Sequence, residues 1–177
     1  MKNFKENIEG WQVPNELVEY RYRLGFEVNP NGKKCMTFIG LNPSDAHYDY
    51  RLKNLKLDKT AYICSEFSLN EGFREVELLN LFAYRHKEKG VLLKVEDPLG
   101  ENNDEFIKNA VEKADKIVVA WGRYFNSKIY ERAKEVEKIL KPPKNKVYCI
   151  RKNQDGSPTH ASRQSPKLKI EKLYFNN

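Results

Sequence analysis

The chain has 177 residues, of which 40% are hydrophobic and 32% charged, and its formal net charge at pH 7 is +7. This length suits one domain with its own core, and the composition excludes a chain that is disordered throughout. No apolar run approaches the roughly 20 residues of a membrane-spanning helix, and no apolar segment follows the first basic residues as in a signal peptide. We therefore expect a single domain, residues 1–177, in the cytoplasm.

The cysteines and histidines are few and far apart. Cys35, Cys64 and Cys149 are odd in number and form no C-x-x-C pair, which argues against a disulfide framework and against a zinc site. No two of the three histidines have the spacing of metal ligands. We expect neither a metal nor another cofactor.

The positive charge is concentrated towards the C-terminus. Residues 128–177 hold thirteen Lys and Arg against five Asp and Glu, whereas residues 1–127 hold nineteen against twenty. A local basic surface suits a phosphate-bearing partner such as a nucleotide or a nucleic acid. A solvated, lysine-rich helix face is the alternative, because lysine is a common surface residue.

The first forty residues predict a leading segment and two strands. The leading segment, residues 1–19, contains a helix start at Pro14. Residues 20–28 alternate between apolar and polar side chains, the pattern of a half-exposed strand. Residues 35–41 are apolar and read as a buried strand, and a turn at residues 29–32 precedes them. We expect these two strands to form an antiparallel hairpin.

Helices and strands alternate in the rest of the chain. After an aromatic and charged loop at residues 47–51, the expected helices span residues 58–69, 103–114 and 126–140. The expected strands span residues 74–80, 116–121 and 146–150, and residues 151–177 form a loop and a basic helix or coil. This order predicts a three-layer α/β/α domain whose central sheet is mostly parallel and four-stranded, with an additional N-terminal hairpin strand.

Unusual residues follow the predicted core strands. Because the carboxyl ends of parallel strands share one edge of a sheet, we expect these residues to line a single cleft. The candidates for catalysis are Asn42, Asp45 and His160. The candidates for ligand binding are Gly40, Leu41, Pro43, Ser44, Tyr48, Tyr50, Asn80, Arg85, Trp121, Gly122, Arg123 and Ser162. An Asx-Pro turn followed by a helix cap is the simpler interpretation of residues 42–45.

Six blocks in order resemble a bacterial family known as domain of unknown function 1643. They are G-L-N-P-S at residues 40–44, D-x-T at 58–60, N-L-F-A-x-R at 80–85, D-P-L-G-x-N-N-D at 97–104, A-W-G at 120–122 and P-x-H at 158–160. The resemblance covers most of the chain beyond residue 20. It implies no established activity.

A more distant resemblance is to the uracil-DNA glycosylases. These enzymes have a G-x-[ND]-P turn, an L-L-x-N or L-L-N stretch, an L-W-G stretch and an H-P-S-type loop at successive strand ends, and this chain has related blocks at residues 40–43, 78–80, 120–122 and 160–162. The last block lacks the proline. The resemblance implies a glycosylase-like fold and a hydrolase that acts on a base, nucleoside, nucleotide or nucleic acid.

The glycosylase resemblance also implies roles for particular side chains. Asn42 would position a water opposite the glycosidic carbon, Asn80 would pair with the amide edge of a base, and His160 would donate to an oxygen of the departing base. Tyr48 or Tyr50 could stack on the base. Asp45 and Arg123 have no counterpart in the glycosylase pattern.

Each role has a structural alternative. Asn80 could cap the loop that follows it, His160 could be a surface histidine, Trp121 could belong to the core, and Arg85 could pair with a carboxylate instead of a phosphate. At the level of function, the alternatives to a glycosylase-like enzyme are a non-catalytic module that binds nucleotides or single-stranded nucleic acid, and a plain interaction domain.

Overall fold

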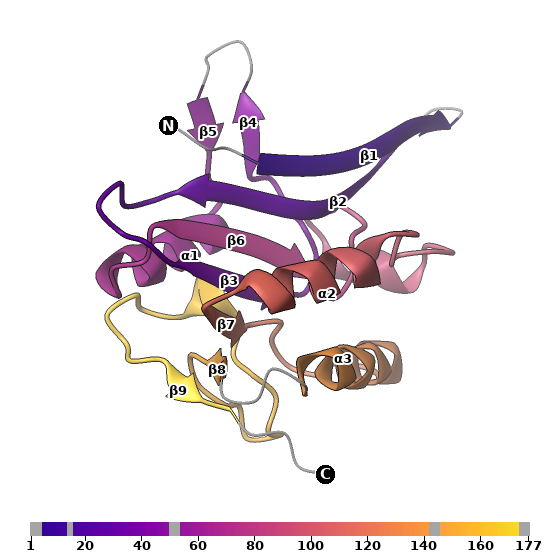
Figure 1. Ribbon diagram of the computed structural model, residues 1–177. Coiled ribbons are helices and arrows are strands. Elements are labelled where there is room, and N and C mark those ends of the chain that lie inside the picture. The colour runs from indigo at the N-terminus through magenta and orange to yellow at the C-terminus, as the bar shows by residue number, and fades with distance from the viewer. Residues whose placement is uncertain (1–4, 14–15, 50–53, 142–145, 174–177) are drawn as a thin grey trace.

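The computed structural model describes residues 5–13, 16–49, 54–141 and 146–173, which form a mixed α/β fold with one large sheet (Figure 1). The seven strands of this sheet lie in the order β1-β2-β6-β3-β7-β8-β9. They are β1 (Lys5–Val13), β2 (Glu16–Glu27), β3 (Cys35–Gly40), β6 (Glu75–Asn80), β7 (Lys116–Val119), β8 (Val147–Cys149) and β9 (Glu171–Lys172). The predicted mixed α/β class is confirmed. In the described ranges no helix has the length and apolar character needed to cross a membrane.

Four neighbouring strands in the middle of the sheet are parallel: β6, β3, β7 and β8. Phe38 of β3 stands beside Leu78 of β6 on one side and Val118 of β7 on the other. Nearly continuous apolar runs of this kind are typical of strands that are covered on both faces. Since the four strands are parallel, their carboxyl ends meet at one edge of the sheet.

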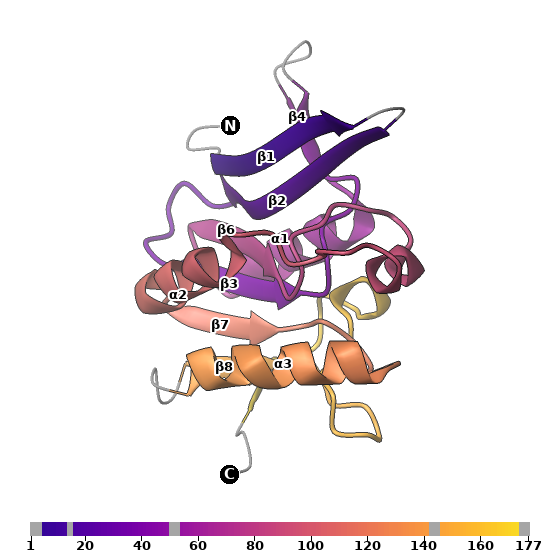
Figure 2. The ribbon, with the colours of Figure 1, turned by 90° about the vertical axis from the view of Figure 1, so that its right-hand side faces the viewer.

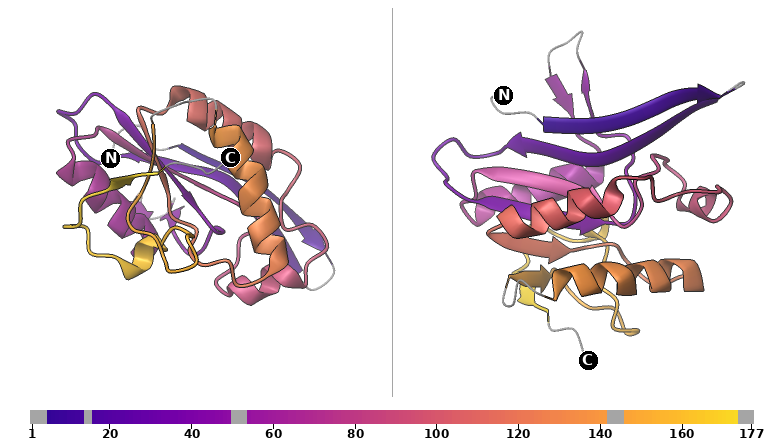
Figure 3. Two further views of the ribbon diagram at one scale, coloured as in Figure 1. Left: turned by 90° about the horizontal axis from the view of Figure 1, so that it is seen from below. Right: turned by 45° about the vertical axis from the view of Figure 1, so that its right-hand side comes forward.

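The helices cover both faces of the sheet. α1 (Lys59–Asn70) lies on one face, and α2 (Asn103–Lys113) and α3 (Ser127–Leu140) lie on the other, as Figures 2 and 3 show. Two short 3-10 helices, η1 (Lys89–Leu93) and η2 (Ala161–Arg163), belong to the connections. η2 packs beside α1 (Figure 3, left). The segment that carries His160 is therefore brought to the same side as the start of α1.

Each face of the sheet has its own apolar core, because successive side chains of a strand point to opposite faces. Phe38 packs with Phe67 of α1, their ring centroids 6.4 Å apart. The next residue, Ile39, belongs to the opposite cluster, which contains Trp121 and Ile129 of the α2 and α3 side. Because apolar side chains fill both faces of the sheet, polar side chains can gather at the ends of the strands.

The predicted hairpin between residues 20–28 and 35–41 is wrong. β2 pairs antiparallel with β1 and with β6, and β6 lies between β2 and β3. The N–H groups of Val28 and Asn29 both donate to the carbonyl of Arg74, at 2.8 and 3.2 Å, so the connecting segment turns onto β6. The turn residues reverse the chain, but the very apolar β3 is buried best between two parallel strands.

The leading segment also differs from the prediction. Glu16 and Leu17 lie in β2, paired with Val13 and Gln12 of β1, so no helix starts there; Pro14 itself is outside the described residues. Pairing satisfies the backbone groups of both strands, and this tertiary gain overrides a local helix signal. The expected loop at residues 47–51 begins with β4 (His47–Asp49), which pairs with β5 (Asn54–Lys56). The C-terminal coil includes β9, which pairs with β8.

Candidate functional site

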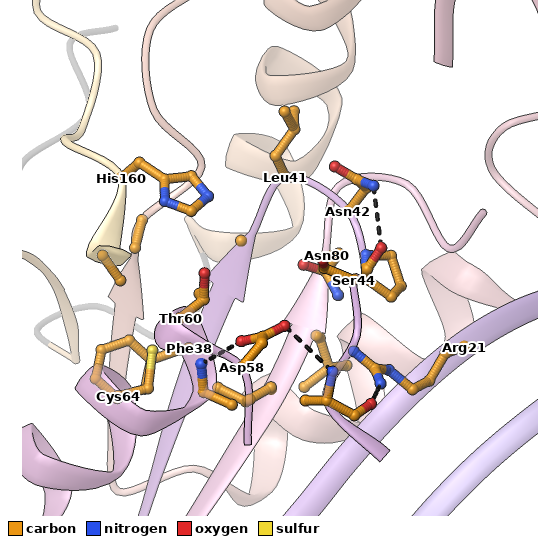
Figure 4. A pocket seen from close by; sticks show the side chains of 18 residues that line it. Arg21, Phe38, Leu41, Asn42, Ser44, Asp58, Thr60, Cys64, Asn80 and His160 are labelled. Carbon is orange, nitrogen blue, oxygen red and sulfur yellow. Dashed lines mark hydrogen bonds between the residues drawn. The ribbon is translucent and has the colours of Figure 1, made fainter. Parts of the chain in front are cut away.

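A recess lies at the carboxyl ends of β3 and β6, closed on its other sides by the start of α1 and by the segment that carries His160 (Figure 4). We call it the inner recess. Its volume is about 40 Å³. Its lining includes Arg21, Phe38, Gly40, Leu41, Asn42, Pro43, Ser44, Ala46, Asp58, Thr60, Ala61, Cys64, Leu78, Leu79, Asn80, Ala120, His160 and Ala161.

A larger hollow of about 670 Å³, the outer groove, adjoins the inner recess. Five residues line both: Leu41, Asn42, Ser44, Thr60 and His160. The outer groove is otherwise bordered by residues 86–90, by residues 121–123 with Phe125, and by residues 153, 159 and 162–164. Its volume falls within the range of about 300–1,000 Å³ that is usual for small-molecule sites, whereas the inner recess is far smaller.

The Asn80 carboxamide faces the inner recess with no hydrogen bond to any described residue. Its neighbour across the parallel register is Gly40, which has no side chain to fill the space above the strand. The Asn80 backbone is fixed instead, because its carbonyl accepts a 3.2 Å hydrogen bond from Asn103 Nδ2. The predicted alternative, that the Asn80 side chain caps the following loop, is not what the structure has. Both the donor and the acceptor of this amide are available to a ligand.

The Asn42 carboxamide is held by its nitrogen. Nδ2 donates to the carbonyl of Pro43 at 3.1 Å and to the carbonyl of His86 at 2.7 Å. These two acceptors fix which end of the amide is nitrogen, and the oxygen points the other way (Figure 4). Asn42 borders both the inner recess and the outer groove. Its Oδ1 can accept a hydrogen bond from a water molecule or a ligand but cannot take a proton away.

Nε2 of the His160 ring has no hydrogen-bond partner among the described residues. Nδ1 accepts a 3.3 Å hydrogen bond from the Ser162 N–H and lies 2.9 Å from Ser162 Oγ. Burial lowers the pKa of His160, and the charges of Arg163 and Lys89 lower it further, against a smaller opposing effect of Asp58. The ring is therefore neutral at pH 7, and with Nδ1 acting as an acceptor the proton is on Nε2. Such a ring is a neutral hydrogen-bond donor.

Asp58 and Thr60 are recess residues that the sequence analysis missed. Asp58 Oδ1 accepts from the Ala61 N–H at 2.8 Å and caps α1, while Oδ2 accepts from the Ala46 N–H at 3.3 Å. The carboxylate thus ties residues 42–46 to the helix and borders the recess at the same time. The D-x-T block at residues 58–60 could have identified both residues. A helix cap requires only the aspartate, so a pattern that also includes Thr60 indicates a role beyond capping.

Two predicted site residues do not face either cavity. Arg85 donates from Nε to the Ser44 carbonyl at 2.8 Å, donates to the Ala46 carbonyl at 3.4 Å, and forms an ion pair with Glu19. The alternative of a carboxylate partner for Arg85 is thus what the structure has. Asp45 is exposed and forms a 3.0 Å ion pair with Lys87. Both residues fix the loop that carries Asn42 instead of contacting a ligand in the recess.

The other predicted residues are distributed between the two cavities. Gly40, Leu41, Pro43 and Ser44 line the inner recess, and Gly122, Arg123 and Ser162 line the outer groove. Trp121 borders the groove but is only 1% exposed, so most of its ring belongs to the core. The side chain of Tyr48, and Tyr50 as a whole, lie outside the described residues.

The chain matches the model of a known protein family. A family model described as a protein of unknown function (DUF1643) matches residues 21–161, which include the whole lining of the inner recess. This confirms the resemblance to that family, while the likeness to uracil-DNA glycosylases remains a prediction. No curated protein and no solved structure matches the chain significantly.

Proposed function

The chain belongs to the DUF1643 family of proteins of unknown function, and from the side chains that line its cleft we propose that it recognises a nucleobase or nucleotide and hydrolyses an N-glycosidic bond, as uracil-DNA glycosylases do. One observation carries the proposal. An amide with free donor and acceptor, an amide oxygen and a neutral imidazole N–H border one recess, although Asn42, Asn80 and His160 are far apart in the chain.

The chemistry of Asn80 supports recognition of a base. A carboxamide presents one donor and one acceptor side by side, which matches the edge of a base that carries a carbonyl next to an N–H, or a nitrogen next to an amino group. The inner recess is too small for a complete nucleoside by the usual size of ligand sites, so one edge of the base enters it. The sugar and phosphate then lie in the outer groove.

Asn42 and His160 supply what hydrolysis needs at the two ends of the bond. Asn42 Oδ1 holds a water against the sugar carbon while the bond from that carbon to the base nitrogen breaks and its electron pair leaves with the base. His160 Nε2–H stabilises the negative charge that develops on the base. The water oxygen then bonds to the sugar carbon and releases a proton. Asp58, the carboxylate in the described lining of the inner recess, is the group that can accept it.

A non-catalytic binding module is the second candidate, and two observations favour it. The Asn42 amide is neither an acid nor a base, and both Asp58 oxygens already accept backbone hydrogen bonds. A module of this kind would use the same recess to bind a base without breaking a bond.

A thermal-shift screen with bases, nucleosides, nucleotides and short oligonucleotides tests recognition, because a ligand that binds only the folded state raises the melting temperature. The best ligand is then incubated with the protein, and free base is measured by chromatography. We expect Asn80→Ala to abolish the shift and Asn42→Ala to keep the shift but abolish base release. Asn109→Ala, at an exposed position of α2, is the matched control. A shift without base release supports the binding module, and no shift with any ligand excludes both candidates.

A further inference from the structure

The outer groove has a strongly basic rim. Lys87, Lys89, Arg123 and Arg163 are exposed and line it, against a single acidic residue, Glu88, in its described lining. Lys87 forms an ion pair with Asp45. Lys89, Arg123 and Arg163 form no ion pair within the described part of the chain. Arg123 acts electrostatically on Asp155, a carboxylate outside the described lining of the groove. The described lining nevertheless keeps an excess of positive charge, which favours an anionic ligand.

An exposed aromatic ring stands on the same rim. Phe125 is 39% exposed, and the ammonium group of Lys89 lies 4.6 Å from the centre of its ring. An exposed ring in a basic groove is the arrangement on which proteins stack the bases of single-stranded nucleic acids. Phe125 follows β7 and does not line the inner recess, so this ring is separate from the amide of Asn80.

We propose that the outer groove binds a single-stranded polynucleotide, with Phe125 stacking on a base next to the one that enters the inner recess and with Lys89, Arg123 and Arg163 contacting its phosphates. This proposal rests on the proposed recognition of a base at Asn80. A mononucleotide has one base and one phosphate-bearing sugar, and it would leave the Phe125 ring and most of the cations unused.

The cations also lie on separate segments around the groove. Lys89 begins η1, Arg123 follows β7, and Arg163 ends η2. Their distribution suits successive phosphates of one strand better than a single phosphate group. A single strand is preferred over a duplex, because the faces of paired bases are covered by their neighbours and cannot stack on Phe125.

Fluorescence anisotropy with labelled 12-nucleotide DNA and RNA strands tests the proposal. We expect a 12-mer of either sugar type to bind at least tenfold more tightly than the mononucleotide, and the DNA and RNA arms decide which is preferred. The logarithm of the binding constant should fall with the logarithm of salt concentration with a slope on the order of −2, since each phosphate contact contributes about −0.7 for a single strand. Arg123→Gln should reduce this slope by about 0.7.

Phe125→Ala should weaken binding of the 12-mer by about 5- to 150-fold, the range expected from loss of one stacked base. Tyr62→Ala is the matched control, because Tyr62 is 51% exposed on α1 and lies outside the described lining of the groove. Equal affinity for mononucleotide and 12-mer, an unchanged affinity of both Phe125→Ala and Arg123→Gln, or equally tight binding of duplex would overturn the proposal. In those cases an effect of Asn80→Ala on mononucleotide binding would leave recognition of a base in place. If no nucleotide or strand binds, both proposals are wrong.

Discussion

The Asn42 carboxamide and the backbone carbonyl of His86 are joined by a 2.7 Å hydrogen bond across 44 positions of the chain. The His86 N–H in turn donates to the Pro43 carbonyl at 3.0 Å, so residues 42–43 and 86 hold each other in both directions. Arg85, the preceding residue, donates hydrogen bonds to the carbonyls of Ser44 and Ala46. The segment after β6 therefore fixes the turn after β3, and with it the direction of the Asn42 oxygen.

Asn42→Asp should weaken the turn after β3. A carboxylate has no N–H to donate, so it would face the carbonyls of Pro43 and His86 without a hydrogen bond and would be repelled by both. We expect the free energy of unfolding to fall by about 1–3 kcal/mol, the usual result of leaving partly buried polar groups unpaired. Urea unfolding measures the change, and Asn109→Asp on the exposed surface of α2 serves as the control. Equal stability of Asn42→Asp and wild type would mean that these two hydrogen bonds do not hold the turn.

Gly40 leaves the space that Asn80 Oδ1 occupies. A Cβ at Gly40 would lie 2.7 Å from that oxygen, so in Gly40→Ala the Asn80 side chain must turn away. Because the oxygen is the end of a side chain without other hydrogen bonds, we expect the free energy of unfolding to change by less than about 1 kcal/mol. The Asn80 side-chain amide signals in a ¹H–¹⁵N NMR spectrum should move, and the ligand-induced thermal shift should disappear. Asn109→Ala, at an exposed position of α2 outside the described lining of both cavities, should change neither. Unmoved Asn80 signals in Gly40→Ala would contradict this account.

The sequence was sufficient to predict the parallel core of the fold. β3, β7 and β8 are mostly apolar, and β6 ends in the apolar pair Leu78-Leu79 before Asn80, so burial of these strands could be read from the sequence. The neighbour of β2 could not be predicted, because alternating side chains indicate which face is buried but not which strand lies alongside. β9 consists of two exposed charged residues whose backbone pairs with β8, and two charged residues form no apolar pattern from which a strand could be predicted.

The candidate site was predictable to the same extent. Asn42, Asn80 and His160 were found because they follow core strands, and parallel strands bring such positions together. Arg85 was misassigned because its partners include two backbone carbonyls. Every residue has such a carbonyl, so the sequence does not show which ones an arginine will bind. Asp58 was overlooked because its capping role alone was enough to explain it.

His160 predicts a pH dependence of stability. The folded protein binds the proton of this ring less readily than the unfolded chain, because the pKa of His160 is lowered. The unfolded chain therefore gains a proton first as the pH falls below the ordinary histidine value of about 6.5, and the free energy of unfolding decreases in that range. Above that value the ring is neutral in both states and contributes nothing to the slope.

We expect His160→Gln to lose less stability than wild type between pH 7.5 and pH 5.5, measured by urea unfolding at each pH. An NMR titration of the wild-type ring should give a midpoint below 6.5. Equal losses in the two proteins, together with a midpoint at or above 6.5, would show that the ring is not held neutral.

Two substitutions at Asp58 can separate the effect of its helix cap from the effect of its negative charge. Asn and Asp are about equally good N-cap residues, so Asp58→Asn keeps an oxygen for the Ala61 N–H while it removes the negative charge. Asp58→Ala removes both hydrogen bonds, to Ala61 and to Ala46, and we expect it to lower the free energy of unfolding by about 1–2 kcal/mol. Asp58→Asn keeps the cap but places an amide nitrogen, which cannot accept, opposite the Ala46 N–H, so it should lose only the part of this stability that comes from that second hydrogen bond.

The effect of the Asp58 charge can be measured separately, through the pKa of His160. Asp58 raises the pKa of that ring against the larger lowering effects, so both variants should move the NMR midpoint of His160 further down. A purely structural role would give a stability loss without this movement in Asp58→Asn. If the His160 midpoint is unchanged in Asp58→Asn, the carboxylate and the imidazole do not share the recess electrostatically, and Asp58 cannot be the group that accepts the proton of the attacking water.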